Sequence, residues 1–344
     1  MSCKSLIAAF AATIVASACS QPMKSVKINY LPTIPDAAYA KGVSAPFCGF
    51  VGDTLVLAGG ANFPDKPLLE GGAKRVYADI WALHDGVWTH AGCLPDSVAY
   101  GATFSIGDAL VFAGGNVRGE TTAKVYKIEL REGKALISEL PPLPVPMEQC
   151  AWSQHSETLF LAGQEGVFCC KAGEYKWKKL ADSPEAFVQP VAFATADKLY
   201  LWGGFNPQTL LAPPDGCSLD LNTLEWSAAP SIPDGGTFVG ATGVTLPDGT
   251  FAVAGGVNRS IFERALRNTP EDRIPYLSHE PAWYKFRKEI FVFDPDSMQW
   301  STIGSFEETA LAGPGMTARG DSIIVSGGEL KPGVRSPRTI SLNL

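Results

Sequence analysis

Histidine is scarce in this sequence, and the short motifs that usually mark metal sites are missing. Four histidines occur among 344 residues, at scattered positions, and neither an HExxH nor a CxxC motif is present. Zinc sites in proteins draw mainly on closely spaced cysteine and histidine side chains. We therefore expect no metal site, and no enzyme that depends on clustered histidine ligands.

Positive charge is not in excess either. The chain has 28 Lys and Arg against 35 Asp and Glu, so its formal net charge is −7, and no basic stripe is present. Domains that bind nucleic acid carry such a patch or stripe, so nucleic acid is not an expected partner. The apolar run from Leu6 to Val15 is too short to span a membrane.

The N-terminal residues have the composition of an export signal. A short basic start leads into this apolar run and then into Ala16-Ser17-Ala18, a small-residue cleavage site. Cys19 follows, so Ala-Ser-Ala-Cys resembles a bacterial lipoprotein box, in which the cysteine becomes a lipid anchor; the same residues also satisfy ordinary secretion. We interpret residues 1–18 as a signal peptide and 19–26 as a tether. We expect a periplasmic or outer-membrane-anchored domain.

Six cysteines remain beyond Cys3 and the candidate anchor. An exported domain permits disulfides, but the spacing of these six is irregular, and Cys169 and Cys170 are neighbours. We expect mostly buried free thiols and at most one bridge.

A glycine pair recurs along the chain. Five short apolar runs end in Gly-Gly and read LVLAGG, LVFAGG, LYLWGG, FAVAGG and IIVSGG, and a sixth, LFLAGQ, is a degenerate copy. Runs of this length with β-branched or aromatic residues indicate strands. A glycine pair at a strand end indicates unusual backbone angles or the close approach of a neighbour. A repeat of about 50 residues is typical of kelch-type propeller blades.

A second marker completes the repeating unit. Most glycine pairs are followed by an apolar strand, a polar turn and a tryptophan, at Trp88, Trp177, Trp226 and Trp300. Each unit therefore supplies four strands, which resembles the kelch motif. The sequence predicts an all-β, six-bladed kelch-type propeller over residues 27–344, closed by an N-terminal strand in VKINYLPTIP. An open β-array or a sandwich is the alternative.

One blade contains a long insertion. Residues 259–288, in the fifth blade, are rich in charged and aromatic side chains, and Ile261 to Leu266 could begin a helix. Prolines 270, 275 and 281 would break a longer helix. Long inserts often carry function, but this one could equally be a spacer or a cap over the central channel.

Three loops after glycine pairs place an asparagine at the same offset. Asn62, Asn206 and Asn258 each lie two residues beyond the pair. In a propeller these loops gather around the channel, where ligands bind. An amide that both donates and accepts suits sugar hydroxyls. Asparagine also tolerates left-handed turns, and this explanation carries equal weight.

The loop after the last glycine pair holds the sharpest candidate site. In Gly-Glu-Leu-Lys-Pro-Gly-Val-Arg, Glu329 and Arg335 flank a Pro-Gly turn that can bring both side chains toward one pocket. Arginine can clamp a carboxylate with two hydrogen bonds, and glutamate can move protons. By itself, the pattern is more typical of an exposed surface ion pair.

Three blades together resemble the N-acetylneuraminate epimerase family, whose members are exported kelch propellers also called sialic acid mutarotases. The matching motifs are Gly-Glu-x-Lys-Pro-Gly-x-Arg, GGVNxxIF, and GGAxF followed by EGxxK and DI, which cover Glu70, Lys74 and Asp79. The resemblance implies that Glu329 and Arg335 are the active-site residues. Family members begin at what is here the third blade, so it also implies a cyclic permutation. Asn116 replaces an acidic residue of the family pattern.

The resemblance implies that the chain interconverts the α and β anomers of N-acetylneuraminic acid by acid-base assisted ring opening. Glu329 would carry the proton and Arg335 would hold the C1 carboxylate, with Lys74 or Lys331 adding positive charge. No cofactor or metal is required, the only partner is a small sugar acid, and a monomer is favoured. The alternatives are a carbohydrate- or protein-binding propeller without catalysis, or a mutarotase for another acidic or acetamido sugar.

Overall fold

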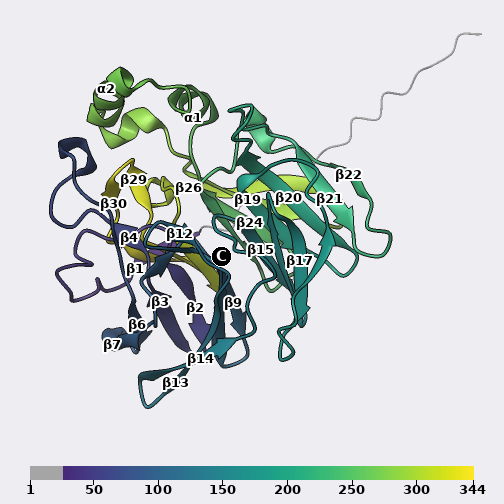
Figure 1. The fold of residues 1–344 in the computed structure, drawn as a ribbon, viewed down its shortest axis with the longest axis horizontal. Coiled ribbons are helices and arrows are strands. Elements are labelled where there is room, and N and C mark those ends of the chain that lie inside the picture. Colours follow the sequence, from purple (N-terminus) through teal and green to yellow (C-terminus); the bar gives the residue numbers. More distant parts are fainter. Residues whose placement is uncertain (1–25) are drawn as a thin grey trace, which may run out of the picture.

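A computed structural model describes residues 26–344 (Figure 1). The expected signal peptide, the candidate lipid anchor Cys19 and the rest of the tether up to residue 25 lie outside the described residues. In the described part, no helix is both long enough and apolar enough to cross a membrane.

The described residues form six four-stranded antiparallel sheets, so the predicted all-β class is confirmed, and the arrangement is consistent with a propeller. The first three sheets, in chain order, consist of β2 (Phe47–Val51), β3 (Thr54–Ala58), β6 (Asp79–His84) and β7 (Val87–Cys93); β9 (Ala102–Ile106), β10 (Ala109–Ala113), β13 (Val125–Arg131) and β14 (Lys134–Leu140); and β15 (Ala151–His155), β16 (Thr158–Gly163), β17 (Gly166–Lys171) and β18 (Lys178–Ala181).

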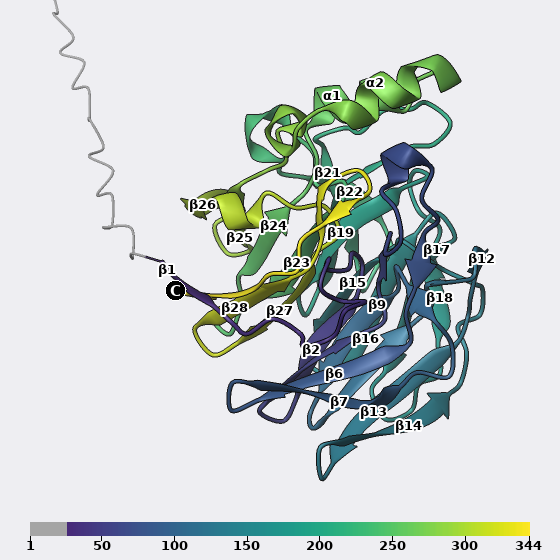
Figure 2. The same ribbon diagram turned by 90° about the vertical axis from the view of Figure 1, so that its left-hand side faces the viewer.

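The other three sheets come from the second half of the chain together with one strand from its beginning. They consist of β19 (Val188–Ala194), β20 (Lys198–Phe205), β21 (Gly216–Asp220) and β22 (Trp226–Ala229); β23 (Ala241–Thr245), β24 (Phe251–Gly255), β25 (Glu289–Asp294) and β26 (Gln299–Ser305); and β27 (Gly315–Arg319), β28 (Ser322–Ser326), β31 (Thr339–Asn343) and β1 (Lys27–Tyr30). Strand β1 pairs with β31 from Lys27 opposite Asn343 to Tyr30 opposite Ile340, and Figure 2 shows it beside the C-terminal end.

The loops between these strands carry short strands and helices. The short strands are β4 (Ala61–Asn62), β5 (Arg75–Val76), β8 (Val98–Ala99), β11 (Asn116–Val117), β12 (Glu120–Thr121), β29 (Glu329–Lys331) and β30 (Val334–Arg335). The helical turns are η1 (Leu68–Glu70), η2 (Pro233–Gly235), α1 (Arg259–Ala265), η3 (Pro270–Asp272), α2 (Arg273–Ser278), η4 (Pro281–Tyr284) and η5 (Glu307–Thr309).

The hydrophobic core lies between neighbouring sheets. All five residues of β10 are buried, whereas exposed and half-buried positions alternate along most of the outer strand β14. A strand that is covered on both faces reads as a continuous apolar run, and an edge strand alternates. Phe47 and Val56 of the first sheet therefore pack in one cluster with Leu110 and Phe112 of the second.

The glycine pairs mark where one sheet meets the segment that leads into the next. All ten of these glycines have positive φ, as the sequence predicts. In the first pair, the Gly60 N–H donates to the Val98 carbonyl (3.0 Å). A Cβ added to Gly59 would lie 2.3 Å from that carbonyl oxygen, so no larger residue fits. The same contact recurs at Gly114 with Met147, at Gly255 with Leu311 and at Gly327 with Val43.

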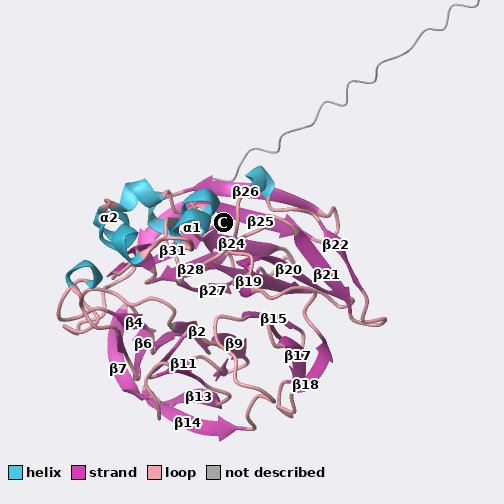
Figure 3. Ribbon diagram, turned by 45° about the horizontal axis from the view of Figure 1, so that its top comes forward, coloured by secondary structure: helices cyan, strands magenta, loops and turns pink. Residues whose placement is uncertain are grey.

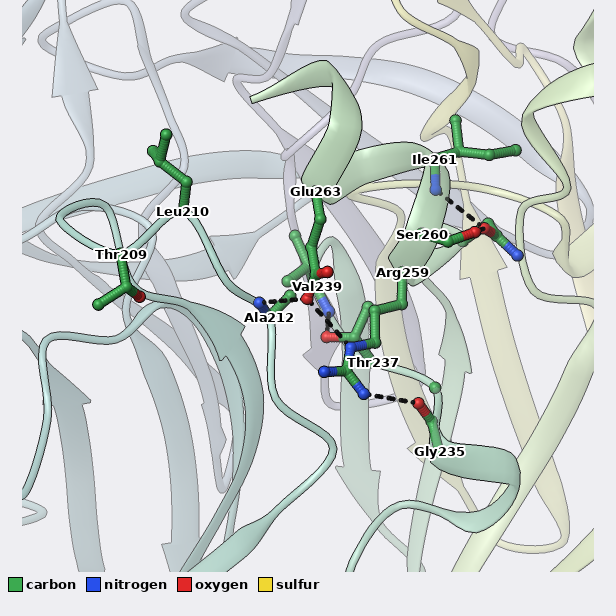
Figure 4. Close-up of polar contacts among 12 residues, drawn as sticks. Thr209, Leu210, Ala212, Gly235, Thr237, Val239, Arg259, Ser260, Ile261 and Glu263 are labelled. Carbon is green, nitrogen blue, oxygen red and sulfur yellow. Dashed lines mark hydrogen bonds and ion pairs between the residues drawn. The ribbon is translucent and has the colours of Figure 1, made fainter. Parts of the chain in front are cut away.

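The insertion of residues 259–288 folds into α1, η3, α2 and η4. These helical turns lie together on one side of the molecule, at the top of Figure 2, and they form most of the cyan ribbon in Figure 3. Figure 4 shows how α1 is held: Glu263 accepts a hydrogen bond from the Ala212 N–H (2.9 Å) and pairs with Arg259, which donates to the Gly235 carbonyl (3.2 Å). The insertion is therefore attached to the loops of two sheets.

All six described cysteines are free thiols. Four are buried, Cys217 is half-buried and Cys93 is exposed. The expectation of mostly buried free thiols is confirmed.

Candidate active site

Six residues with left-handed backbone angles stand at the start of the first strands of the six sheets: Ala45, Tyr100, Gln149, Gln189, Gly240 and Gly313. We call them the six left-handed residues. Five backbone hydrogen bonds of 2.6 to 3.2 Å link them, from Tyr100 to Ala45, Gln149 to Tyr100, Gln189 to Gln149, Ala45 to Gly313 and Gly313 to Gly240. Four of the six are not glycine. Such angles are costly for these residues and are kept where the surrounding structure requires them.

A pocket of about 240 Å³ opens against the six left-handed residues, all of which line it. The insertion contributes another part of the lining, with the side chains of Ile261, Phe262, Tyr276, Tyr284 and Phe286. Glu329 and Asn258 also line the pocket. A mainly apolar pocket with a few converging polar groups is typical of a small-molecule site. The insertion thus lines the pocket, so it is more than a spacer.

Glu329 is fixed by backbone hydrogen bonds on both of its sides. It is the first residue of β29, directly after the last glycine pair, and it exchanges two backbone hydrogen bonds with Ala312 (2.6 and 2.9 Å). The turn through Pro332 and Gly333 then makes Arg335 of β30 its cross-strand partner. Glu329 Oε1 lies 2.8 Å from Arg335 Nη1. The turn thus brings the two side chains together.

This ion pair is not the exposed pair that the sequence left open. The Arg335 side chain is only 2% exposed and that of Glu329 is 26% exposed. Arg335 is not part of the pocket lining and lies behind Glu329. There its Nε donates to the Ala61 carbonyl (3.1 Å), and its guanidinium carbon lies 5.2 Å from the centre of the Phe63 ring. A guanidinium buried in this way needs its carboxylate partner.

Burial raises the pKa of Glu329 above its usual value, and this effect outweighs the opposite influence of Arg335 and Lys74. A carboxyl group in a water-poor pocket favours its neutral form, while nearby cations favour the ionised form. Glu329 is therefore closer than an ordinary glutamate to the pH range in which a group can both accept and release a proton.

Lys74 stands at the rim of the pocket. Its Nζ donates to the Tyr100 hydroxyl (3.1 Å) and lies 5.1 Å from the centre of the Tyr100 ring. Tyr100 lines the pocket, whereas the Lys74 side chain is exposed. Lys331 has a different environment, because its Nζ donates to the Leu277 and His279 carbonyls (3.3 and 2.6 Å) and so ties β29 to the end of α2.

Comparison with known proteins shows the family of this chain. The family model of N-acetylneuraminate epimerase matches residues 13–137 and 140–344. The chain belongs to this family. N-acetylneuraminate epimerases from Yersinia pestis (strain Pestoides F) and Haemophilus influenzae (strain PittEE) are both 27% identical, over 220 and 218 residues respectively. These alignments cover 58% of this chain, and 56% and 58% of the relatives, so the match spans little more than half of their length.

The three asparagines do not share one role in this family member. Asn62 is fully buried: its amide donates to the Ala38 and Gly42 carbonyls, and it accepts from the Tyr77 hydroxyl. Asn206 Oδ1 accepts from the Gln208 and Thr209 N–H groups in a tight turn. Asn258 caps α1 through the Ile261 N–H (3.1 Å), and it alone of the three lines the pocket. None of the three has the left-handed backbone angles of the alternative explanation either. Asn206 and Asn258 act through their side chains, as the acceptor of a turn and as a helix cap.

The sequence did not point to several residues of this epimerase-family pocket. Tyr100, Gln149 and Gln189 line it, as does Tyr276, whose pKa burial raises to about 12, with the nearby Tyr284 and Glu329 adding to the effect. The first three share a position just before or at the start of a first strand, so aligning the repeats at this point would have found them. Glu70, in the exposed η1, is away from this lining.

Proposed function

We propose that this chain interconverts the α and β anomers of N-acetylneuraminate. Membership of the N-acetylneuraminate epimerase family and the activity for which its relatives are named support this proposal. The single observation that carries it is Glu329, a pocket-lining carboxyl group with a raised pKa that is fixed from behind by Arg335. This is the arrangement that a general acid-base catalyst needs.

We further propose that the six sheets are the blades of a closed kelch propeller. Supporting this, the first strands contact one another in the order β2, β9, β15, β19, β23 and β27, and β27 contacts β2. The hydrogen bond from the Ala45 N–H to Gly313 links the first sheet to the last in the same way. The six left-handed residues then surround the mouth of the central channel, where propellers usually bind ligands.

The cyclic permutation belongs to the same proposal. The two segments matched by the family model meet between residues 137 and 140, in β14, the last strand of the second sheet. If the chain is permuted and starts two blades before its relatives, its match to the family model should be interrupted at this point. Because each blade contacts only its neighbours, the site keeps its composition wherever the chain begins.

In the proposed reaction, the ionised Glu329 takes the proton of the anomeric hydroxyl group and delivers it to the ring oxygen, as the bond between the anomeric carbon and the ring oxygen breaks. The open chain carries a ketone that can rotate before the ring closes from its other face, with the proton transfers reversed. Ring opening and ring closure are the only covalent steps, and positioned proton transfer contributes about 10²–10⁴-fold to such a rate. The chain's own residues supply this chemistry without a cofactor.

We propose a supporting role for Arg335 in place of the expected clamp on the substrate. With its Nε on Ala61 and its Nη1 against Glu329, the guanidinium orients this carboxylate and stabilises its ionised form. Lys74, at the rim beside Tyr100, is better placed to meet the C1 carboxylate of the sugar. Lys331 would act at a distance by holding the insertion.

The test follows the conversion of freshly released α-N-acetylneuraminate to the β anomer by NMR. We expect micromolar protein to shorten the equilibration time well below that in buffer. If folded wild-type protein leaves the time unchanged but binds the sugar, the chain is a binding propeller. A panel of other acidic and acetamido sugars in the same assay would reveal a different substrate.

We also propose that the chain is exported, on the strength of the basic start, the apolar run and the small residues before Cys19. The mass of the mature N-terminus distinguishes the two routes. A diacylated Cys19 indicates a lipid anchor, and an unmodified cleaved terminus indicates secretion into the periplasm. A full-length mass in the cytoplasmic fraction would exclude both.

A further inference from the structure

One cluster of potential metal ligands lies away from the pocket, on the outer part of the first sheet. Asp79 is the first residue of β6, and His90 and Cys93 belong to β7. His90 Nε2 lies 3.1 Å from Asp79 Oδ1 and 3.7 Å from Cys93 Sγ, and this Sγ lies 4.0 Å from the same Oδ1. The three ligand atoms therefore lie close to one another. No short sequence motif contains these three residues, because Asp79 belongs to a different strand from His90 and Cys93.

A local irregularity in β7 makes this arrangement possible. Successive side chains of a regular strand alternate between its faces, so residues three apart, such as His90 and Cys93, would point to opposite faces. Here the pairing with β6 shifts register: Ile80 faces Gly92, whereas Trp81 faces His90. One extra residue on a strand returns the following side chains to the other face. The side chains of Cys93 and His90 therefore lie on the same face of the sheet. The cross-strand partner of Cys93 is Asp79, which lies on this face too.

The distances match those of a zinc site. Typical bonds of about 2.3 Å to sulfur and about 2.0–2.2 Å to nitrogen and oxygen, at tetrahedral angles, place sulfur about 3.6 Å from either neighbour and nitrogen about 3.3 Å from oxygen. The observed distances are 3.7, 4.0 and 3.1 Å. We propose that Asp79, His90 and Cys93 form a Zn²⁺ site with three protein ligands, and that water occupies the fourth position.

The same three residue types also occur in nucleophilic catalysis, but the geometry argues against that role. In a Cys-His-Asp nucleophile, the acid holds one ring nitrogen while the thiol faces the other. Here both the carboxylate and the thiol lie nearest to Nε2, so the three groups form a cluster around one ring nitrogen instead of a relay through both. The side chains of His90 and Asp79 are 43% and 35% exposed, which leaves room for a bound water.

Cobalt substitution tests the site directly, since Co²⁺ takes the place of Zn²⁺ and reports on its ligands by absorption. The full chain, without a histidine tag and with its thiols kept reduced by a phosphine, is stripped of metal and titrated with Co²⁺. We expect one Co²⁺ per chain, a near-ultraviolet band from thiolate to metal, and loss of this band when one equivalent of Zn²⁺ is added.

Single substitutions assign the ligands. Cys93→Ser should abolish the thiolate band. Cys93→Ser and His90→Ala should each weaken Zn²⁺ binding by more than about 100-fold, because loss of a group that merely supports a metal ligand already costs about 10–100-fold. The matched controls Cys217→Ser and His155→Ala should leave both readouts unchanged. Circular dichroism checks that each variant is folded. A wild type without the thiolate band, or a band that survives in folded Cys93→Ser, would overturn the proposal.

Discussion

Two nearly buried arginines in this protein form ion pairs in very different surroundings. The Arg335 side chain is 2% exposed and pairs with Glu329, a 26% exposed residue of the central pocket. The Arg287 side chain is 8% exposed and pairs at 3.2 Å with Asp234, which is 61% exposed. Arg287 also lies over the Phe291 ring, 4.5 Å from its centre. Both arginines are held, but only Arg335 faces a carboxylate that water cannot freely hydrate.

The arginine is nearly buried in both pairs, so it does not distinguish a reactive site from a structural contact. The difference lies in the environment of the carboxylate partner. Arg287 lies near the end of the insertion, where its N–H donates to the Gly256 carbonyl. Its pair with Asp234 joins this end of the insertion to the η2 turn. Glu329 combines burial, which raises its pKa, with access to the pocket. We therefore expect removal of each carboxylate to have different consequences.

The largest difference should appear in the rate of anomer equilibration. Glu329→Gln keeps the shape of the side chain but cannot take up the anomeric proton, so we expect the catalysed rate to fall by about 10²–10⁴-fold. Asp234→Asn is the matched control, because asparagine tolerates the positive φ of this position, and it should keep the wild-type rate. NMR rates measured on both folded variants decide the matter. Equal rates in the two variants would remove Glu329 from the mechanism.

Arg335→Met should change the pH profile of the same reaction. Arg335 lowers the pKa of Glu329, so its removal raises this pKa further. A base acts in its ionised form, and the rising limb of the rate profile should therefore move to higher pH. The measurement is the rate as a function of pH in wild type and variant. If the rate falls but the rising limb of the profile stays at the same pH, Arg335 contributes only to packing.

Arg287→Met should have a smaller effect, and on stability instead of rate. Asp234 is exposed and stays hydrated when its partner is lost, so no buried charge is stranded. The loss is then mainly that of the contacts with the Phe291 ring, which amounts to about 1–2 kcal/mol of unfolding free energy. Urea denaturation measures this, with the rate per folded protein expected to stay unchanged. A loss of activity in folded protein would show that this pair also shapes the pocket.

The sequence was most informative where the repeat constrains the backbone and least informative where side chains from neighbouring sheets combine. The glycine pairs predicted the second strands, because only glycine fits beside the next segment. The six left-handed residues went unnoticed because they share a backbone conformation and not a chemical type. Asn62, Asn206 and Asn258 share an offset but not a role, since the loops beyond the glycine pairs differ in length and folding. The cluster around Cys93 depends on an irregularity that no linear motif reveals.

The smallest expected effect is also a test of sign. The folded pKa of Glu329 is raised above the ordinary value of 4.5, so between these two values the folded state binds more protons than the unfolded state. The stability contributed by this group should therefore fall as pH rises from about 4.5 to the raised pKa, and stay level above it. The Glu329→Gln variant has no titrating group at this position, so the difference in unfolding free energy between wild type and variant isolates the effect. If the ion pair with Arg335 dominated instead, the pKa would be lowered and stability would rise with pH below about 4.5. Urea denaturation of both proteins across this range distinguishes the two signs, and a rise would contradict the dominance of burial at Glu329.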